Sequence, residues 1–310
     1  MKQTEEIVIV AVVTFNSESV LEGLISSLSA GFADVLHHLV VADNASTDGS
    51  VATVRRLAPE ATVVEVGRNA GYAAGINAAV AAAPAHTAVL ALNPDVRLGE
   101  GSIPVLLRAL REPGTGIAVP RLIDAHGRLI ESIRRRPTVT RALADALLGA
   151  RRAGRYPLLG EVASDPAVYD VEGPIDWAEG STQLISAECW KACGPWDESY
   201  FLYSEETDFD LRAGDAGFAT RFVPSAQATH LEGGSGASPE LWSLLMMNRV
   251  RLFRRHRGTL PTIPFWAATL LRESSRALQG KATSRAAVRA LVNPSRMRET
   301  PGPHSIRASR

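Results

Sequence analysis

The sequence predicts an α/β fold, in which a mostly parallel sheet is flanked by helices. Short β-branched runs alternate with helical patterns over the first 120 residues, and a cluster of polar residues follows each of these runs. The alternation of strand and helix is typical of parallel sheets that are covered on both faces. A third observation, an excess of arginine after position 249, sets apart the end of the chain.

Each element of the first part has its own signal. Ile7–Val13 is rich in β-branched residues and is bounded by Thr14 and Asn16, which is typical of a buried strand. Apolar residues then recur at the spacing of one helix face. The same reasoning predicts further strands at 39–42, 62–66 and 87–92, and helices at 20–28, 51–57 and 72–83. In such sheets ligands bind beyond the carboxyl ends of the strands.

The remainder of the chain is less regular. Residues 129–170 contain an arginine run and many Gly and Pro, and we expect them to leave the sheet. An amphipathic helix is predicted for 238–256. The apolar stretch after Gly258 is broken by Pro261 and Pro264, and the last 20 or so residues are expected to be disordered.

Charge is unevenly distributed along the chain. Residues 249–310 carry 14 basic and 2 acidic residues, whereas the rest carries 19 basic and 31 acidic residues, so the two parts have net charges of about +12 and −12. A basic tail on an acidic body indicates an anionic partner. Nucleic acid is not expected, because no recognition module accompanies the arginines. The start of the chain lacks a secretory pattern and no run reaches a membrane span, so we expect a cytoplasmic protein.

Polar side chains follow all four predicted strands. Turn and capping chemistry explains any one such loop, but it explains four in succession less well. A carboxylate after the second strand, Asp43, could accept a hydrogen bond from the N3–H of a pyrimidine. Asp95 suits a Mg²⁺ or Mn²⁺ ion that bridges to a diphosphate. The predicted nucleotide-binding residues are Thr14, Asn16, Asp43, Asn44, Arg68, Asn69, Asn93 and Asp95.

Three acids, Glu205, Glu206 and Asp208, lie close together later in the chain. Crowded carboxylates raise one another's pKa, which favours a general base near neutral pH. Acids in the first turn of a helix also stabilise the helix dipole, and this structural role is the alternative. Asp208 is expected to orient a neighbour or to cap the helix, with Arg212 as its partner.

Together these motifs resemble the family-2 glycosyltransferases. The resemblance is carried by the segments VVTFN, DNASTDGS, GRNAGYAAGIN, LNPD, DWAEGSTQLI and FLYSEETDFDLR, and it covers about residues 7–255. It implies a GT-A fold, which is a Rossmann-like nucleotide-sugar domain. Within the family the sequence is most similar to bacterial rhamnosyltransferases that build cell-wall or O-antigen linkers.

The resemblance implies an inverting sugar transfer in cell-envelope glycan synthesis. The favoured donor is dTDP-L-rhamnose, with UDP-sugars open, and the favoured acceptor is N-acetylglucosaminyl diphosphopolyprenol. Glu206 holds the place of the general base, although Glu205 remains an alternative. Asn93 replaces the first acid of the usual Asp-x-Asp pair, so the strictness of the Mg²⁺ or Mn²⁺ requirement is open. His230 matches a metal ligand of some relatives.

Four residues are predicted to bind the acceptor. Trp177 and Gly180 lie in the stretch that lines the sugar and acceptor pocket of relatives. Arg135 and Arg136, in the run Arg134–Arg136, could clamp a diphosphate, and the alternative is a solvated basic loop.

We therefore expect a catalytic domain over 1–257 and a basic, partly disordered tail over 258–310. The donor half would be about 1–120 and the acceptor and catalytic half about 121–257. Apolar residues at 241–253 and 265–271 among arginines favour an interfacial helix, and hence a peripheral position on the inner face of the cell membrane. The alternative is a helix that packs on the catalytic domain.

Two other functions compete with sugar transfer. A sugar nucleotidyltransferase would need a Gly-rich, Lys-containing loop after the first strand, where this chain has TFNSES. A non-catalytic nucleotide-sugar-binding relative would have no need of Asp95 and Glu206.

Overall fold

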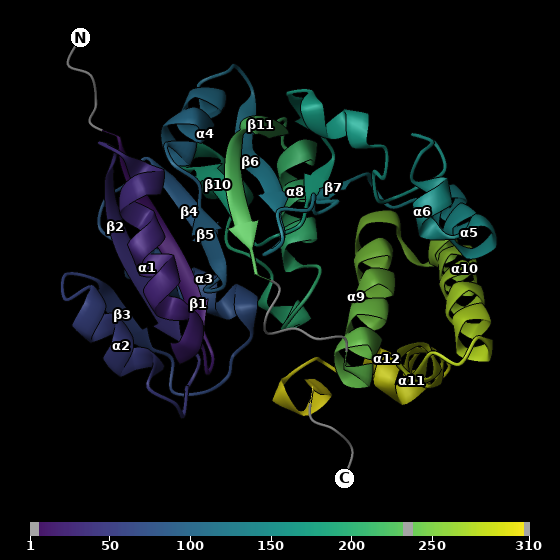
Figure 1. Ribbon diagram of the computed structural model, residues 1–310. Helices are drawn as coiled ribbons and strands as arrows, with labels where there is room; N and C mark the ends of the chain where they lie inside the picture. Colours follow the sequence, from purple (N-terminus) through teal and green to yellow (C-terminus); the bar gives the residue numbers. More distant parts are fainter. Residues whose placement is uncertain (1–5, 232–237, 307–310) are drawn as a thin grey trace.

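The computed structural model describes residues 6–231 and 238–306, and its centre is a nine-stranded mixed sheet (Figure 1). The strand order is β3-β2-β1-β4-β10-β6-β11-β5, and β8 pairs with β11. The strands are β1 (Ile7–Thr14), β2 (Leu36–Asp43), β3 (Thr62–Glu65), β4 (Ala88–Leu92), β5 (Val96–Leu98), β6 (Thr115–Ile123), β8 (Gly173–Ile175), β10 (Thr182–Ser186) and β11 (Ala219–His230). A separate two-stranded sheet joins β7 (Ile133–Arg134) to β9 (Trp177–Ala178).

The four predicted strands are confirmed as β1 to β4, and they pair in parallel. Strand β2 begins at Leu36, three residues earlier than predicted, because His37 and His38 continue the pairing with β1 although they break the apolar run. Beyond β4, strand β10 runs antiparallel to both its neighbours. Four carboxyl ends therefore meet at one edge of the sheet, as the sequence predicts.

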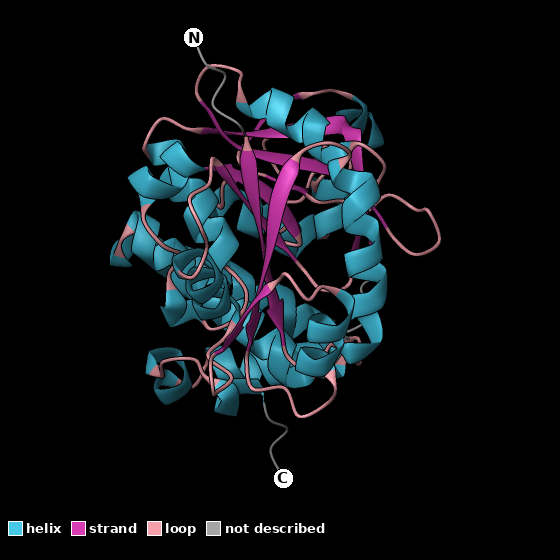
Figure 2. Cartoon of the chain, turned by 90° about the vertical axis from the view of Figure 1, so that its left-hand side faces the viewer, coloured by secondary structure: helices cyan, strands magenta, loops and turns pink. Residues whose placement is uncertain are grey.

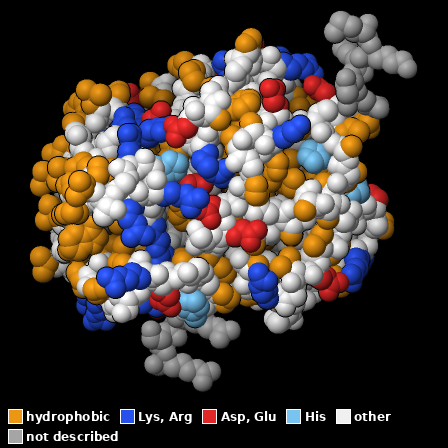
Figure 3. All heavy atoms as spheres, turned by 180° about the vertical axis from the view of Figure 1, so that it is seen from behind, with side chains coloured by type: hydrophobic (Ala, Val, Ile, Leu, Met, Phe, Trp, Pro, Cys, Tyr) orange, Lys and Arg blue, Asp and Glu red, His pale blue; other side chains and the backbone are white. Residues whose placement is uncertain are grey.

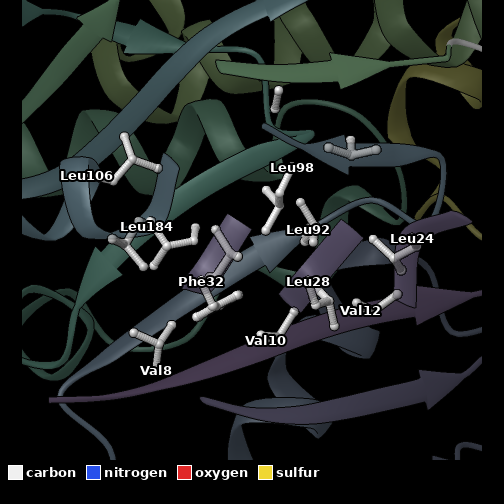
Figure 4. Packing of buried hydrophobic residues seen from close by; sticks show 14 of the residues in the cluster. Val8, Val10, Val12, Leu24, Leu28, Phe32, Leu92, Leu98, Leu106 and Leu184 are labelled. Atoms are coloured by element: carbon white, nitrogen blue, oxygen red, sulfur yellow. The ribbon is translucent and has the colours of Figure 1, made fainter. Parts of the chain in front are cut away.

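Helices cover both faces of the sheet (Figure 2). Alternate residues of β1 point to opposite faces. Val8, Val10 and Val12 pack with residues of α1 such as Leu24 and Phe32 (Figure 4), whereas the residues between them pack against α3. The helices of this part are α1 (Glu18–Phe32), α2 (Ser50–Leu57), α3 (Tyr72–Ala81), α4 (Ser102–Leu110), α7 (Ala187–Cys193) and α8 (Glu205–Asp215).

A second group of helices has its own apolar core beside the sheet domain (Figure 1). It comprises α5 (Val139–Leu148), α6 (Ala150–Ala153), α9 (Pro239–Arg257), α10 (Thr259–Leu278), α11 (Ala282–Leu291), α12 (Pro294–Arg298) and the 3₁₀ turn η3 (Pro303–Ile306). The core joins Phe253 of α9, Phe265 of α10 and Leu291 of α11. Within the described residues, no helix is both long enough and apolar enough to cross a membrane.

The structure corrects two expectations for this region. Residues 291–306 are not disordered, because α11 buries Ala287 and Leu291 while Arg251 donates to the backbone oxygens of Arg296 and Glu299. The many arginines of this segment obscured the helical spacing of its buried apolar residues in the sequence. Residues 307–310 lie outside the described part of the chain. The two prolines do not break α10: Pro261 lies in its first turn, where N–H groups have no partner within the helix, and the helix continues through Pro264.

Candidate active site

A cavity of about 390 Å³ opens at the carboxyl ends of the first four strands. Five of the eight predicted nucleotide-binding residues line it: Asn16, Asn44, Asn69, Asn93 and Asp95. Apolar side chains, including Phe15, Val20 and Leu202, form much of the remaining wall. A mainly apolar hollow with a few convergent polar groups is typical of a small-molecule site.

The remaining three predicted residues lie elsewhere. Asp43 is buried, and its carboxylate accepts hydrogen bonds from the hydroxyls of Thr14 (2.8 Å) and Ser46 (2.6 Å). Thr14 and Asp43 therefore fix the loop after β2 rather than line the cavity. Arg68 lies exposed in the loop after β3.

A close approach of backbones joins this cavity to the acidic segment. The amide of Tyr72 donates to the carbonyl of Phe201 (2.8 Å), and a Cβ at Gly71 would lie 2.2 Å from that same oxygen. Gly71 also has φ +92°, so only glycine fits here without strain. Asn44 donates to the Gly71 carbonyl (2.9 Å), which ties the loop after β2 to the same point.

The acids themselves begin α8 after an unusual turn. Phe201, Tyr203 and Ser204 all have positive φ, a conformation that non-glycine residues seldom adopt. The turn is stabilised from α9, where the Asn248 amide donates to three backbone carbonyls, at 2.9 to 3.1 Å. Strain of this kind persists where the surroundings over-determine it, as they do at functional sites.

The side chain of Glu206 is partly buried, and its pKa is shifted. Burial, together with the nearby charge of Glu179, raises the pKa of Glu206 to about 7, while backbone hydrogen bonds and the charge of Arg134 oppose the rise. A Cβ at Gly180 would lie 2.8 Å from the Glu206 Cβ, so the predicted residue Gly180 makes room for this side chain. Glu205 is only 2% exposed, and burial together with Glu206 raises its pKa well above the ordinary range.

Three further ionisable side chains meet beside the cavity. The Nε2 atom of His230 is 3.3 Å from Asp95 Oδ1, and its Nδ1 atom is 3.5 Å from Glu179 Oε1. Strand β11 places His230 opposite Val96, next to Asp95. The predicted residues Asp95 and His230 are thus neighbours. The described residues contain no ready-made group of three or more His, Cys, Asp or Glu side chains arranged to hold a metal ion.

Sequence reasoning missed Glu179 and Tyr72. Glu179 lies between the predicted residues Trp177 and Gly180, and its Oε2 atom is buried without a hydrogen-bond partner among the described residues. The Tyr72 hydroxyl is likewise buried and unpartnered there. Burial raises its pKa, and so do four carboxylates, those of Glu205, Glu206, Glu179 and Asp95. Tyr72 lies in the motif GRNAGYAAGIN, whose place after the third strand could have indicated that it belongs to the site.

Three of the predicted acceptor residues, Arg135, Arg136 and Trp177, make contacts within the protein. Arg135 donates to the carbonyls of Gly154 and Gly160, and Arg136 pairs with Asp215 at 2.9 Å. Trp177 is buried, and its indole N–H donates to the Arg135 carbonyl (3.1 Å). The neighbouring Arg134, whose guanidinium lies over the Trp177 ring at 5.9 Å, is the arginine whose charge reaches Glu206.

Asp208 faces away from the other acids. Its carboxylate is buried between Arg212 (2.8 Å) and His256 of α9 (3.0 Å), so the predicted partnership with Arg212 is confirmed. Burial alone would raise its pKa, but hydrogen bonds from His256 and Arg212 hold the pKa of Asp208 below its ordinary value.

Comparisons with known proteins agree with this arrangement. The model of glycosyl transferase family 2 matches residues 9–150. The chain is 31% identical over 232 residues to the N-acetylglucosaminyl-diphospho-decaprenol L-rhamnosyltransferase of Mycobacterium tuberculosis, which covers 71% of this chain and 75% of that protein. It is 27% identical over 209 residues to the low-salt glycan biosynthesis hexosyltransferase Agl10 of Haloferax volcanii, covering 66% of this chain and 60% of that protein.

Solved structures share the fold. The mannosyltransferase PcManGT from Pyrobaculum calidifontis, in complex with GDP-Man and Mn²⁺, aligns with a TM-score of 0.56 at 16% identity, over 93% of this chain and 76% of its own. GalNAc-T7 with UDP, GalNAc and Mn²⁺ aligns with a TM-score of 0.58 at 15% identity, over 82% and 48%. These similarities identify the sheet domain as a GT-A fold. The chain therefore belongs to glycosyltransferase family 2, and it is a glycosyltransferase.

Proposed function

We propose that the protein is an inverting glycosyltransferase that uses Glu206 as its general base. The donor nucleotide sugar would occupy the cavity at the strand ends, and the acceptor hydroxyl would approach from the side of α8. The observation that carries the proposal is the position of Glu206, whose pKa is raised to about 7 and whose charge acts on Tyr72, a residue that lines the nucleotide-sized cavity. A base poised near the working pH is the efficient choice for proton removal.

The chemistry needs no nucleophile from the enzyme. Glu206 takes the proton of the acceptor hydroxyl as the new glycosidic bond forms, and the nucleoside diphosphate leaves from the opposite face of the anomeric carbon, which inverts its configuration. Glu179 raises the pKa of the base and Arg134 moderates it. Glu205, more deeply buried and with its pKa raised further, is in our proposal a neutral neighbour that limits charge repulsion.

A divalent cation fits this site. Asp95, Glu179, Glu205 and Glu206 surround one tyrosine hydroxyl, so a diphosphate would meet acids rather than positive charge. Mg²⁺ and Mn²⁺ are commonly held by one or two carboxylates together with substrate phosphates. Asp95 and His230 are the proposed ligands, with the Glu179 Oε2 atom close by. Such an ion would stabilise the charge of the leaving diphosphate.

The finer assignment follows the relatives. The mycobacterial relative is named for L-rhamnosyl transfer to a lipid-linked acceptor, and we propose dTDP-L-rhamnose and a polyprenyl-diphosphate-linked sugar as the substrates here. A lipid-linked acceptor would place the enzyme at a membrane surface. Sugar nucleotidyl transfer and non-catalytic binding are the alternatives, and the retained acids disfavour the second.

The test is a donor panel. The full chain is incubated with dTDP-L-rhamnose, UDP-sugars and GDP-mannose, each with and without Mg²⁺ or Mn²⁺, beside an N-acetylglucosaminyl diphospho-lipid. We expect nucleoside diphosphate release and a glycosylated lipid with dTDP-L-rhamnose and metal. Release of a different nucleotide would change the donor, and formation of a nucleotide sugar from a sugar phosphate would replace the proposal with nucleotidyl transfer.

The metal prediction is tested by Asp95→Ala. Donor affinity measured by calorimetry in Mg²⁺ should fall at least roughly tenfold, because the diphosphate loses its charge bridge. Asp170→Asn, a surface acid paired with Arg121, is the control and should leave that affinity unchanged. Wild-type affinity in Asp95→Ala would contradict the assignment.

A further inference from the structure

In helix α10, several large apolar residues face outward, whereas the charged residues face the protein interior. Its outward stripe is apolar: Leu260 is 80% exposed and Leu278 90% exposed, with Ile263 and Leu271 exposed between them. These residues recur every three or four positions, or multiples of that spacing, so they lie along one side of the helix. No exposed residue of α10 is charged.

The charges of α10 point inward. Glu273 is completely buried, where it accepts a hydrogen bond from the Trp242 indole (2.8 Å) and pairs with Arg272 (2.9 Å). Leucine is normally the buried residue and glutamate the exposed one. The outward leucines are therefore unexplained by the folding of this domain alone, and a large exposed apolar patch marks an interaction site.

Helix α5 and the chain after α6 extend the same surface. Helix α5 packs beside α10 through Ala142, and it exposes Leu143, Leu147 and Leu148; Tyr156 and Leu158 follow. Figure 3, a view from behind, shows hydrophobic side chains gathered along one edge of the molecule, on the side where α5, α6 and α10 lie in Figure 1. We call these exposed residues of α5, α10 and the chain after α6 the leucine face.

The exposed charges on the segments that form the leucine face have one sign. Arg151, Arg152 and Arg155 are exposed, and within the described part of the chain none of them has an ionic partner. The acids of residues 139–160 and 259–278 are Asp145 and Glu273, which are both buried. Figure 3 shows Lys and Arg side chains bordering the hydrophobic area. Exposed leucine with arginine at its border is the pattern of a surface that rests on anionic lipid.

We propose that the leucine face docks on the surface of an anionic lipid bilayer. The leucines enter the boundary between headgroups and acyl chains, and Arg151, Arg152 and Arg155 contact lipid phosphates. This differs in part from the sequence prediction, which assigned the membrane contact to apolar residues of 241–253 and 265–271. The helical core buries most of those residues at least partly, and Leu271 is the one that belongs to the leucine face. The proposal rests on the proposed function only in that a lipid-linked acceptor requires a membrane; the surface itself is argued from exposure and charge.

The experiment measures binding of the full chain to vesicles, without any sugar substrate. Flotation is compared for phosphatidylcholine vesicles and for vesicles with added phosphatidylglycerol. The apolar test variant is Leu260→Gln/Leu271→Gln/Leu278→Gln. Its control, Leu36→Gln/Val171→Gln, changes exposed apolar residues of the sheet domain. The charge variant is Arg151→Gln/Arg152→Gln/Arg155→Gln, with Arg56→Gln/Arg108→Gln as its control.

We expect wild type and both controls to float with the anionic vesicles. The apolar variant should bind at least roughly tenfold more weakly, and the charge variant should lose the preference for phosphatidylglycerol and most of the salt dependence. Circular dichroism and the melting temperature should match wild type in all variants, because the altered side chains are exposed.

Two results would overturn the proposal. One is vesicle binding by the apolar variant equal to wild type. The other is a wild-type dimer in sedimentation analysis that the apolar variant abolishes, which would make the leucine face an interface between copies of this chain. Turnover with a water-soluble, short-chain acceptor tests the proposed function separately, since the leucine-face variants should leave it unchanged.

Discussion

At the scale of single residues, the site depends on where a few carboxylates lie relative to one another. Glu206 and Glu205 are neighbours in the sequence, but Gly180 makes room for the side chain of Glu206, which is only partly buried, whereas Glu205 is buried. Glu179 stands on a different segment and approaches both His230 and Glu206. The surroundings of these two adjacent glutamates therefore differ, and this difference is why we propose different roles for them.

The first prediction separates the two neighbours. Glu206→Gln keeps the shape of the side chain but cannot accept a proton, so single-turnover transfer should fall by roughly 10²–10⁴. Nucleotide affinity, measured by calorimetry, should stay near wild type. Glu205→Gln is the matched variant and should reduce transfer clearly less. Loss of transfer in Glu205→Gln with near-normal rates in Glu206→Gln would reassign the base.

The second prediction concerns Glu179, through its effect on the base. Glu179→Gln removes a negative charge that raises the pKa of Glu206, so that pKa should fall below about 7. A general base works above its pKa, and the acidic limb of the pH–rate profile should therefore move to lower pH. The exposed Glu188→Gln is the control. An unmoved profile would show that Glu179 does not act on the base.

At the scale of elements, the start of α8 is held from behind by α9. Asn248 fixes the turn before α8, and Asp208 is clamped between Arg212 and His256. Helix α9 thus connects the helical group to the turn that precedes α8. The contacts made by Asn248 and His256 of α9 join residues about 50 positions apart, so they hold the start of α8 without leaving a periodic signal in the sequence.

The clamp leads to a third prediction, about stability. Asp208→Asn should lower the free energy of unfolding by roughly 3 kcal/mol, since it removes the buried carboxylate that pairs with Arg212 and bonds to His256. Asp215→Asn, an exposed partner of Arg136, should change it by about 1 kcal/mol or less. Urea denaturation measures both.

The pH dependence of this difference has a definite sign. The folded pKa of Asp208 is lowered, so its contribution is complete above the unfolded pKa of about 3.9 and disappears as the pH falls through the folded pKa. The stability gap between wild type and Asp208→Asn should hold near pH 7 and close under acid. A gap that persists unchanged to pH 2 would exclude the ion pairs as its cause.

The elements also show what the sequence could predict. Strands β1 to β4 follow apolar runs and the loops at their ends carry the cavity residues, so local patterns and family resemblance sufficed for the donor side. The contacts in the second half of the sheet domain were harder to predict. The side chains of Arg135 and Arg136 make internal contacts while Arg134 faces the acids, and Glu179 meets His230 only through tertiary packing. Such contacts between distant segments cannot be predicted from the spacing of residues along the sequence.

At the scale of the whole molecule, the helical group reaches the catalytic domain through its last turn. Ile306 of η3 lines the cavity at the strand ends, opposite residues of β1 and the loop that follows it. The turn is anchored by α9 and by the burial of Ser305. The two parts therefore share one site.

A fourth prediction tests this sharing. Ile306→Ala removes part of an apolar wall and should weaken donor binding by about 1 kcal/mol, or about fivefold. Val292→Ala, an exposed position on the same helical group, should have no effect. Titration calorimetry with the nucleotide sugar measures both. Equal affinities for Ile306→Ala and wild type would show that η3 borders the cavity without contacting the donor.

The position of Ile306 has a consequence for the order in which the cavity can form. One wall of the cavity comes from residues 13–20, and another comes from Ile306, about 290 positions later in the sequence. Contacts between residues so far apart are slow to form, because closing a long loop costs more chain entropy than closing a short one. We therefore expect the sheet to fold before this wall is in place, so that the complete cavity belongs to the folded whole and not to the sheet domain alone.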